Sequence, residues 1–100
     1  MDNREVQRCL AHDHAQKLKE AARRLEGTVR HTQIIESSPL SEMTGHRVLL
    51  KPENLQITGS FKIRGAYNKI ASLSDAELAG GLVTASPGHP AQGVAYAAWE

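Results

Sequence analysis

The strongest constraint on the fold of this 100-residue chain is the order of its apolar segments. Residues 48–50 (Val-Leu-Leu) and 82–86 (Leu-Val-Thr-Ala-Ser) are short runs typical of strands, and each is followed by a loop and a helical pattern. Strands that alternate with helices indicate crossover connections, and therefore a parallel sheet. The sequence predicts an α/β fold: a partial three-layer parallel sheet flanked by helices.

Helical periodicity predicts the elements around these strands. The clearest helix covers residues 58–74, where an apolar face begins at Ile63 and either Thr58 or Ser60 can cap the start. Gly65 costs this helix roughly 1 kcal/mol relative to alanine, which indicates a close packing contact or a ligand. The other predicted helices are residues 13–26 (capped by Asp13), 38–44 (capped by Ser38 and ended by Gly45), 74–80 (a Ser74–Glu77 capping box) and 90–100.

Composition restricts the class of protein and its partners. The chain is 40% hydrophobic and 23% charged, as expected of one globular domain or a part of one. A net charge of +1 favours neither nucleic acid nor a membrane surface as a partner. No run approaches the ~20 apolar residues of a membrane span, and no secretory signal is visible. The single cysteine, Cys9, cannot form an internal disulfide, so the expected compartment is the cytoplasm.

Two loops are the places where a ligand is expected. Ligands of open parallel sheets bind beyond the carboxyl ends of the strands. Residues 51–60 follow the first predicted strand, and residues 86–93 follow the second. Neither loop contains a dinucleotide-binding, hydrolase-nucleophile or Walker motif. These two loops are therefore candidate ligand sites that carry none of these motifs.

Lys62 is the main candidate for chemistry. It lies near the start of the helix predicted over residues 58–74, where the helix dipole disfavours a cation. Partial burial beside Phe61 would lower the pKa of this lysine further. A neutral amine can attack a carbonyl and form an imine. The alternative is a solvated surface lysine, which is the commoner state of this residue.

Histidines and the same helix start offer weaker candidates. His89 lies in the turn between the second strand and the last helix, although most such turn residues are simply exposed. His12 and His14 could contribute to a metal site, but no third ligand supports one. The N–H groups of residues 58–62 could bind an anion, and ordinary capping explains these residues equally well.

Residues 51–70, Lys-Pro-Glu-Asn-Leu-Gln-Ile-Thr-Gly-Ser-Phe-Lys-Ile-Arg-Gly-Ala-Tyr-Asn-Lys-Ile, closely resemble the pyridoxal-phosphate lysine motif of threonine dehydratases (threonine ammonia-lyases). The resemblance extends over residues 17–98. It implies the tryptophan-synthase-β-like fold, type II, of pyridoxal 5'-phosphate enzymes. Serine racemases and serine dehydratases share the motif more loosely.

The resemblance implies a role for five residues. Lys62 would carry pyridoxal 5'-phosphate as an imine and later remove the Cα proton of the amino-acid substrate. Phe61 would line the cofactor site, and Ser86 and Gly88 would belong to the loop that receives the substrate carboxylate. His89 would contact the cofactor's phenolic oxygen. The implied reaction converts threonine to 2-oxobutanoate and ammonia, with serine as a second substrate.

Three departures from the family pattern qualify this expectation. His89 replaces the family's asparagine, and Pro90 has no N–H to donate to a carboxylate. A lost hydrogen bond to a charged group weakens binding by roughly tenfold to a hundredfold. Thr32-Gln33-Ile34 replaces a threonine-proline-leucine run, which we expect to be a structural change only. The family's glycine-rich phosphate loop has no counterpart in these residues.

We therefore expect residues 1–100 to be the N-terminal portion of a pyridoxal-phosphate-dependent domain, with residues 1–16 as an N-terminal extension. The chain alone should be weakly active or inactive. One alternative is a non-catalytic relic or interaction module that pairs through an exposed sheet edge with a partner or with itself, as a homo-oligomer. The other is a stand-alone anion-binding fragment that uses residues 58–62.

Overall fold

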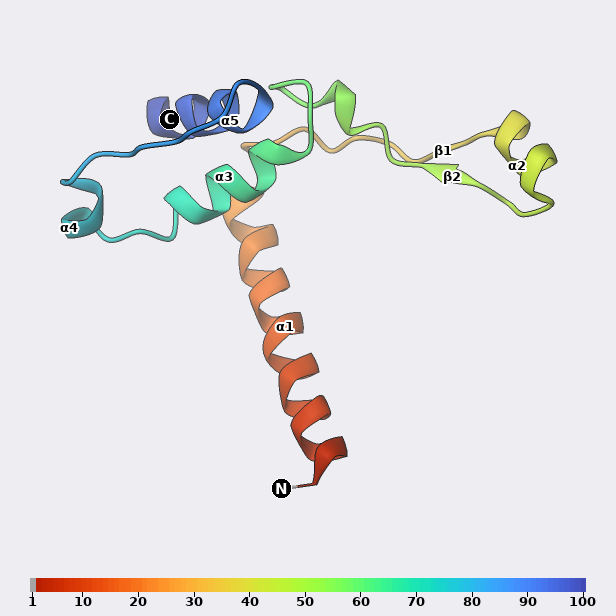
Figure 1. Cartoon of the computed structure of the whole chain (residues 1–100), viewed down its shortest axis with the longest axis horizontal. Coiled ribbons are helices and arrows are strands. Elements are labelled where there is room, and N and C mark those ends of the chain that lie inside the picture. The colour runs from red at the N-terminus through yellow and green to blue at the C-terminus, as the bar shows by residue number, and fades with distance from the viewer. Residues whose placement is uncertain (1) are drawn as a thin grey trace.

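The computed structural model describes residues 2–100 as an open arrangement of helices with one small ladder at its side (Figure 1). Its Cα radius of gyration is 17.6 Å, whereas a compact domain of this length would have about 13 Å. Figure 1 shows α1 projecting from one side of a body that contains α3 and α5, while the β1–β2 ladder extends to another side. The elements are α1 (Asn3–Leu25), β1 (Ile35–Glu36), α2 (Ser38–Thr44), β2 (Leu49–Leu50), the 3-10 turn η1 (Glu53–Leu55), α3 (Lys62–Ile70), α4 (Asp75–Leu78) and α5 (His89–Trp99).

α1 begins ten residues before the helix predicted from Asp13. Asp2 caps it: one carboxylate oxygen accepts the Glu5 N–H at 3.0 Å, while the Asp2 N–H donates to Glu5 at 3.0 Å. This capping box satisfies two N–H groups that a helix start otherwise leaves unpaired. Asp13 lies in mid-helix and pairs with Lys17 at 2.7 Å instead. The prediction of Asp13 as the cap is therefore wrong.

The packed core lies between α3 and α5. Ile63 of α3 is fully buried, and Ala97 of α5 is buried against the same interface. A methyl group placed on Gly93 would lie 3.2 Å from the Ala66 Cβ and 3.3 Å from the Ile63 Cα. Gly93 therefore lets the two helices approach closely. The prediction that Gly65 makes a close packing contact is wrong, because a methyl group there would meet nothing within 4 Å.

These two glycines make a matched pair for a stability experiment. Gly65→Ala should raise the free energy of unfolding by about 0.5–1 kcal/mol, because alanine favours the helix and finds open space. Gly93→Ala should lower it by about 1 kcal/mol, because the added methyl meets helix backbone that cannot move aside. Urea denaturation of both variants measures the difference. Equal shifts in the same direction would contradict close packing at Gly93.

The two observed strands, β1 and β2, form an antiparallel pair, and β1 was not predicted. Ile35 pairs with Leu50 and Glu36 with Leu49. The connection through α2 reverses the chain, so β2 returns along β1. Residues 82–86 are assigned to no strand, because no segment of the described chain lies beside them as a ladder partner. The mixture of helices with a small sheet is consistent with a part of an α/β domain.

Local capping signals predict this structure more accurately than strand patterns do. α2 covers residues 38–44 as predicted and ends at Gly45 with φ 67°, although Ser37 rather than Ser38 is its cap. The Ser74–Glu77 capping box at the start of α4 is confirmed. α5 starts at His89, one residue before its predicted start. In the described residues, no helix combines the length and the apolar character needed to cross a membrane.

Candidate functional site

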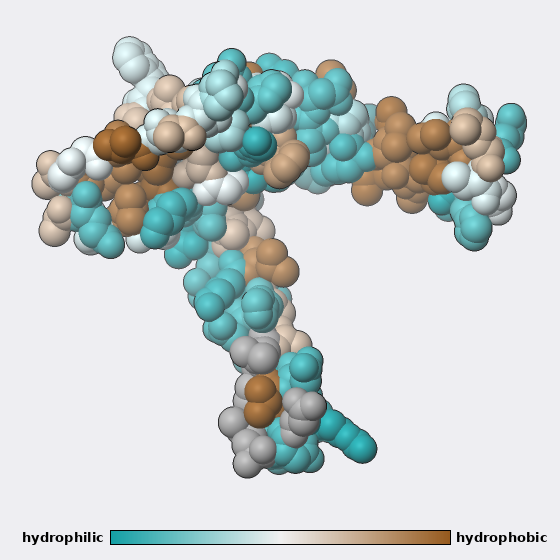
Figure 2. Space-filling model, in the orientation of Figure 1, coloured by the Kyte–Doolittle hydropathy of each residue, from teal (hydrophilic) through white to brown (hydrophobic). Residues whose placement is uncertain are grey.

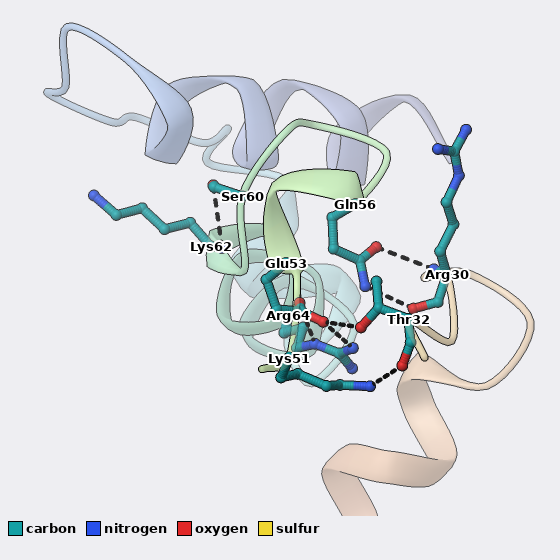
Figure 3. Close-up of polar contacts among 8 residues, drawn as sticks. All are labelled: Arg30, Thr32, Lys51, Glu53, Gln56, Ser60, Lys62 and Arg64. Carbon is teal, nitrogen blue, oxygen red and sulfur yellow. Dashed lines mark hydrogen bonds and ion pairs between the residues drawn. The ribbon is translucent and has the colours of Figure 1, made fainter. Parts of the chain in front are cut away.

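Lys62 is the first residue of α3, and its side chain points away from the polar residues behind it (Figure 3). α3 has no side-chain cap at its start, and only a long 3.4 Å contact joins the Lys62 N–H to Ser60 Oγ. Phe61 is 62% exposed, and Lys62 is exposed as well. The burial expected beside Phe61 is therefore wrong, because both side chains face outward.

An open hollow of ≈ 440 Å³ lies between the first turns of α3 and α5. Its lining includes Phe61, Lys62, Gly65, Ala66, Pro90 and Val94. The fold thus brings the lysine and the turn before α5 to the same place, as expected from the position of the two loops. Gly65 lines this hollow. The prediction that this glycine makes room for a ligand therefore stays a prediction.

The turn over residues 86–90 lies against the loop before α3. The imidazole Nε2 of His89 would be 3.7 Å from a methyl group on Gly59, which has φ 74° and no side chain of its own. Within the turn, the Gly88 N–H donates to Ser86 Oγ at 3.3 Å. His89 is therefore next to the lysine loop. None of the three predicted residues of this turn, Ser86, Gly88 and His89, lines the hollow, whereas Pro90 does.

Behind Lys62, an ion pair fastens α3 to the 3-10 turn η1 (Figure 3). Arg64 donates to both carboxylate oxygens of Glu53, at 2.8 and 2.9 Å, and the Thr32 hydroxyl donates to the same carboxylate at 2.6 Å. The Glu53 side chain is only 15% exposed. Its hydrogen bonds from Arg64, then from Thr32, lower the pKa of Glu53 from 4.5 to about 2. We call Glu53, Arg64 and Thr32 the carboxylate clamp.

Gln56 and Lys51 extend this network to the segment after α1 (Figure 3). The buried Gln56 amide accepts the Arg30 N–H at 3.1 Å and donates to the Arg30 carbonyl at 2.6 Å. The Lys51 ammonium donates to the Thr32 carbonyl. Residues 51–56 and residues 30–32 are therefore tied together just behind the start of α3, which fixes the base of the candidate site.

The family model described as "Pyridoxal-phosphate dependent enzyme" matches residues 25–99. The chain belongs to this family. An L-threonine ammonia-lyase of Thermotoga maritima is 60% identical over 81 residues, which are 81% of this chain and 20% of that protein. The crystal structure of a serine racemase from Dictyostelium discoideum is 43% identical with a TM-score of 0.78, over 83% of this chain and 27% of the other. The crystal structure of a T.th. threonine deaminase is 45% identical with a TM-score of 0.72, over 84% and 30%.

The chain thus spans about a fifth of the Thermotoga maritima protein and less than a third of each solved chain. These likenesses confirm the fold type, an α/β domain of the pyridoxal-phosphate-dependent class, and the family's cofactor. The relatives include both a threonine ammonia-lyase and a serine racemase. The family is therefore established, and the substrate belongs to the proposal below.

The residues around Lys62 fit pyridoxal 5'-phosphate in two respects. Thr58 Oγ1 is buried with no hydrogen-bond partner, in the loop that leads to Lys62. A buried polar group without a partner is rare, and a bound molecule would supply what the protein does not. Phe61 and Lys62 also line the same hollow, and the exposed Phe61 ring is a surface on which a flat aromatic cofactor can stack.

Sequence reasoning missed the carboxylate clamp. Glu53 and Arg64 both lie in the motif of residues 51–70, but their pairing depends on how η1 folds against α3. One feature of the sequence could have indicated the clamp: two polar residues, Glu53 and Gln56, closely follow an apolar strand. Among the side chains that the structure describes, no group of three or more His, Cys, Asp and Glu residues could hold a metal ion.

Proposed function

We propose that this chain supplies the lysine-bearing part of a threonine ammonia-lyase, which converts L-threonine to 2-oxobutanoate and ammonia and accepts L-serine as a second substrate. The observation that carries the proposal is the placement of Lys62 at the start of α3, open to a hollow shared with the turn before α5. The 60% identity to the Thermotoga maritima L-threonine ammonia-lyase supports elimination over racemisation.

Pyridoxal phosphate, when bound, supplies an electron sink for the carbanion formed at the substrate Cα. Lys62 Nζ is the point of covalent attachment and later the base that receives the Cα proton. Its exposed position lets the amine swing between these two tasks. Phe61 lines the hollow and offers its exposed ring to the cofactor. His89 would offer an imidazole N–H to the cofactor's phenolic oxygen, in place of the family's asparagine.

The substrate carboxylate would be held by the turn over residues 86–90. The Gly88 N–H now reaches Ser86 Oγ at 3.3 Å, a long hydrogen bond that a carboxylate could replace. Pro90 contributes no donor, so this turn binds an anion with one N–H fewer than the family's. For this reason we expect the turn to bind the substrate carboxylate weakly.

Borohydride trapping tests the proposal directly. The chain is incubated with pyridoxal phosphate, reduced with borohydride, digested and mapped by mass spectrometry. The expected result is a phosphopyridoxyl label concentrated on Lys62 and lost in Lys62→Ala. Lys69→Ala is the matched control, since Lys69 is an exposed lysine in the last turn of the same helix. A label spread evenly over the lysines would contradict the proposal.

A further inference from the structure

Gly65 lies inside a helix, where glycine is an unfavourable residue. Two glycines of the described chain lie within helices, Gly65 in α3 and Gly93 in α5. After proline, glycine is the residue that least favours a helix interior. α3 is only nine residues long, and helices of this length are marginal without support from packing. A glycine at position 65 therefore calls for a physical reason.

Two ordinary reasons for a glycine do not apply to Gly65. A positive φ favours glycine, but Gly65 is not among the glycines with a positive φ. A close neighbouring element also favours glycine, as Ala66 and Ile63 do at Gly93. At Gly65, by contrast, an added methyl group would meet none of the described residues within 4 Å. The remaining use of glycine is to let a ligand approach the backbone closely.

Gly65 borders the hollow that contains the candidate lysine. The hollow has a volume of ≈ 440 Å³ and is lined by Phe61, Lys62 and Gly65 among others, and small-molecule sites have volumes of about 300–1,000 Å³. Lys62 and Gly65 are three residues apart in α3, so they lie on the same face of the helix. Helical side chains lean toward the N-terminus of their helix. A side chain at position 65 would therefore occupy the space next to Lys62.

We propose that Gly65 keeps free the space beside Lys62 in which pyridoxal phosphate binds. Gly65 is thus a positioning residue, because it has no side chain that could take part in proton transfer. The inference rests on the proposed function, which makes Lys62 the point of attachment. It adds a residue that determines how large a group can be attached there. A side chain at position 65 should weaken binding of the cofactor and at the same time stabilise the free chain.

Gly65→Ala and Gly65→Leu test the proposal, since both introduce residues that favour a helix. Each variant is treated with increasing pyridoxal phosphate and reduced with borohydride. The Lys62 amine condenses with the aldehyde and releases water, and borohydride then donates a hydride to the C=N bond. The concentration that labels half of Lys62 should rise about tenfold in Gly65→Ala and about a hundredfold in Gly65→Leu, because an overfilled site weakens binding by such factors.

Acetaldehyde separates the space beside Lys62 from the reactivity of the Lys62 amine. It undergoes the same condensation and reduction, but it carries only a methyl group in place of the aromatic ring. It should therefore label Lys62 equally in the native chain and in both variants. Lys69→Leu is the matched control, because it places leucine at an exposed position of α3 outside the hollow. It should leave both labels at Lys62 unchanged.

The label is counted at Lys62 alone, because other surfaces of the chain can also bind a flat ring. Figure 2 shows brown, hydrophobic atoms gathered over the β1–β2 ladder. Ile35 and Leu49 of this ladder are each 50% exposed. Binding of the ring to this surface does not depend on position 65. A change confined to the Lys62 label therefore reports on the hollow.

Thermal unfolding without pyridoxal phosphate gives a readout that is independent of the label. Both variants should have a Tm equal to or above that of the native chain, because the new side chain favours the helix and finds open space. A variant that is at least as stable and yet binds less pyridoxal phosphate has not lost its label through unfolding. If Gly65→Leu does not fold, Gly65→Ala decides the test.

The outcomes distinguish this inference from the proposed function. Unchanged labelling by pyridoxal phosphate in the folded variants would overturn the role of Gly65 and leave the proposed function standing. A parallel loss of both labels would show that position 65 acts on the amine itself, which would also overturn the inference. No label at Lys62 in the native chain would contradict the proposed function and, with it, the inference.

Discussion

In a chimera in which this chain replaces the matched 81-residue stretch of the Thermotoga maritima L-threonine ammonia-lyase, Lys62→Ala should lower the rate of 2-oxobutanoate formation from threonine by about 10³-fold or more. In the proposed reaction the Lys62 amine attaches the cofactor and then receives a proton, so alanine removes both contributions at once. Lys62→Arg should fail to the same degree, because a guanidinium keeps its proton at neutral pH and cannot perform either task.

Lys69→Ala is the control for this experiment. Lys69 belongs to the same helix and is exposed, but it lies in the last turn, away from the hollow. Its substitution should change the rate by less than about twofold. A continuous assay of 2-oxo acid formation measures all three variants. Full activity in Lys62→Ala would remove Lys62 from the proposed chemistry, whatever the chimera's stability.

Replacing Arg64 by alanine should destabilise the fold more than any surface substitution. The substitution leaves the largely buried Glu53 carboxylate without its ionic partner. Removing one partner of a fully buried pair lowers the free energy of unfolding by about 3–5 kcal/mol. Because the Arg64 side chain is 33% exposed, water can replace part of the loss, and we expect about 2 kcal/mol. Urea denaturation at pH 7 measures this free energy. Arg47→Ala breaks the exposed pair with Glu36 and should cost less than about 1 kcal/mol.

The effect of Arg64→Ala should also depend on pH in a defined direction. In the folded chain, the carboxylate clamp lowers the pKa of Glu53 from its ordinary value of 4.5 to about 2. The clamp therefore contributes its full stability above about pH 4.5 and loses it as the pH falls toward 2. The stability difference between the native chain and Arg64→Ala should shrink over that range. A difference that is constant with pH would show that Arg64 acts through packing alone.

Signals confined to a few neighbouring residues predicted local structure well. The Ser-Pro start and the Gly45 end placed α2, and the Ser74–Glu77 box placed the start of α4, because capping is settled within one helical turn. Asp13 failed as a cap because several acidic and amide residues compete in the first 13 positions, and Asp2 with Glu5 forms the complete box. The sequence pattern alone does not indicate which of these residues caps the helix.

Features that depend on distant contacts were not predictable from the residues alone. Strand direction depends on which segment lies alongside. Residues 48–50 and 82–86 therefore indicated the α/β class, but in the described chain residues 49–50 pair with residues 35–36 instead. The packing role predicted for Gly65 was wrong and the close approach at Gly93 was missed, because the crossing of α3 and α5 decides which glycine meets the other helix. For the site, the motif identified Lys62, whereas the clamp behind it appears only when η1 is folded onto α3.

The contact between His89 and Gly59 has an evolutionary consequence. The imidazole occupies space beside a residue that has no side chain and holds φ 74°, a backbone conformation that other residues adopt only with strain. A side chain larger than alanine at position 59 would have to displace the imidazole. The two positions should therefore be epistatic: histidine at 89 constrains which residues can be accepted at 59, and a smaller side chain at 89 would relax part of that constraint.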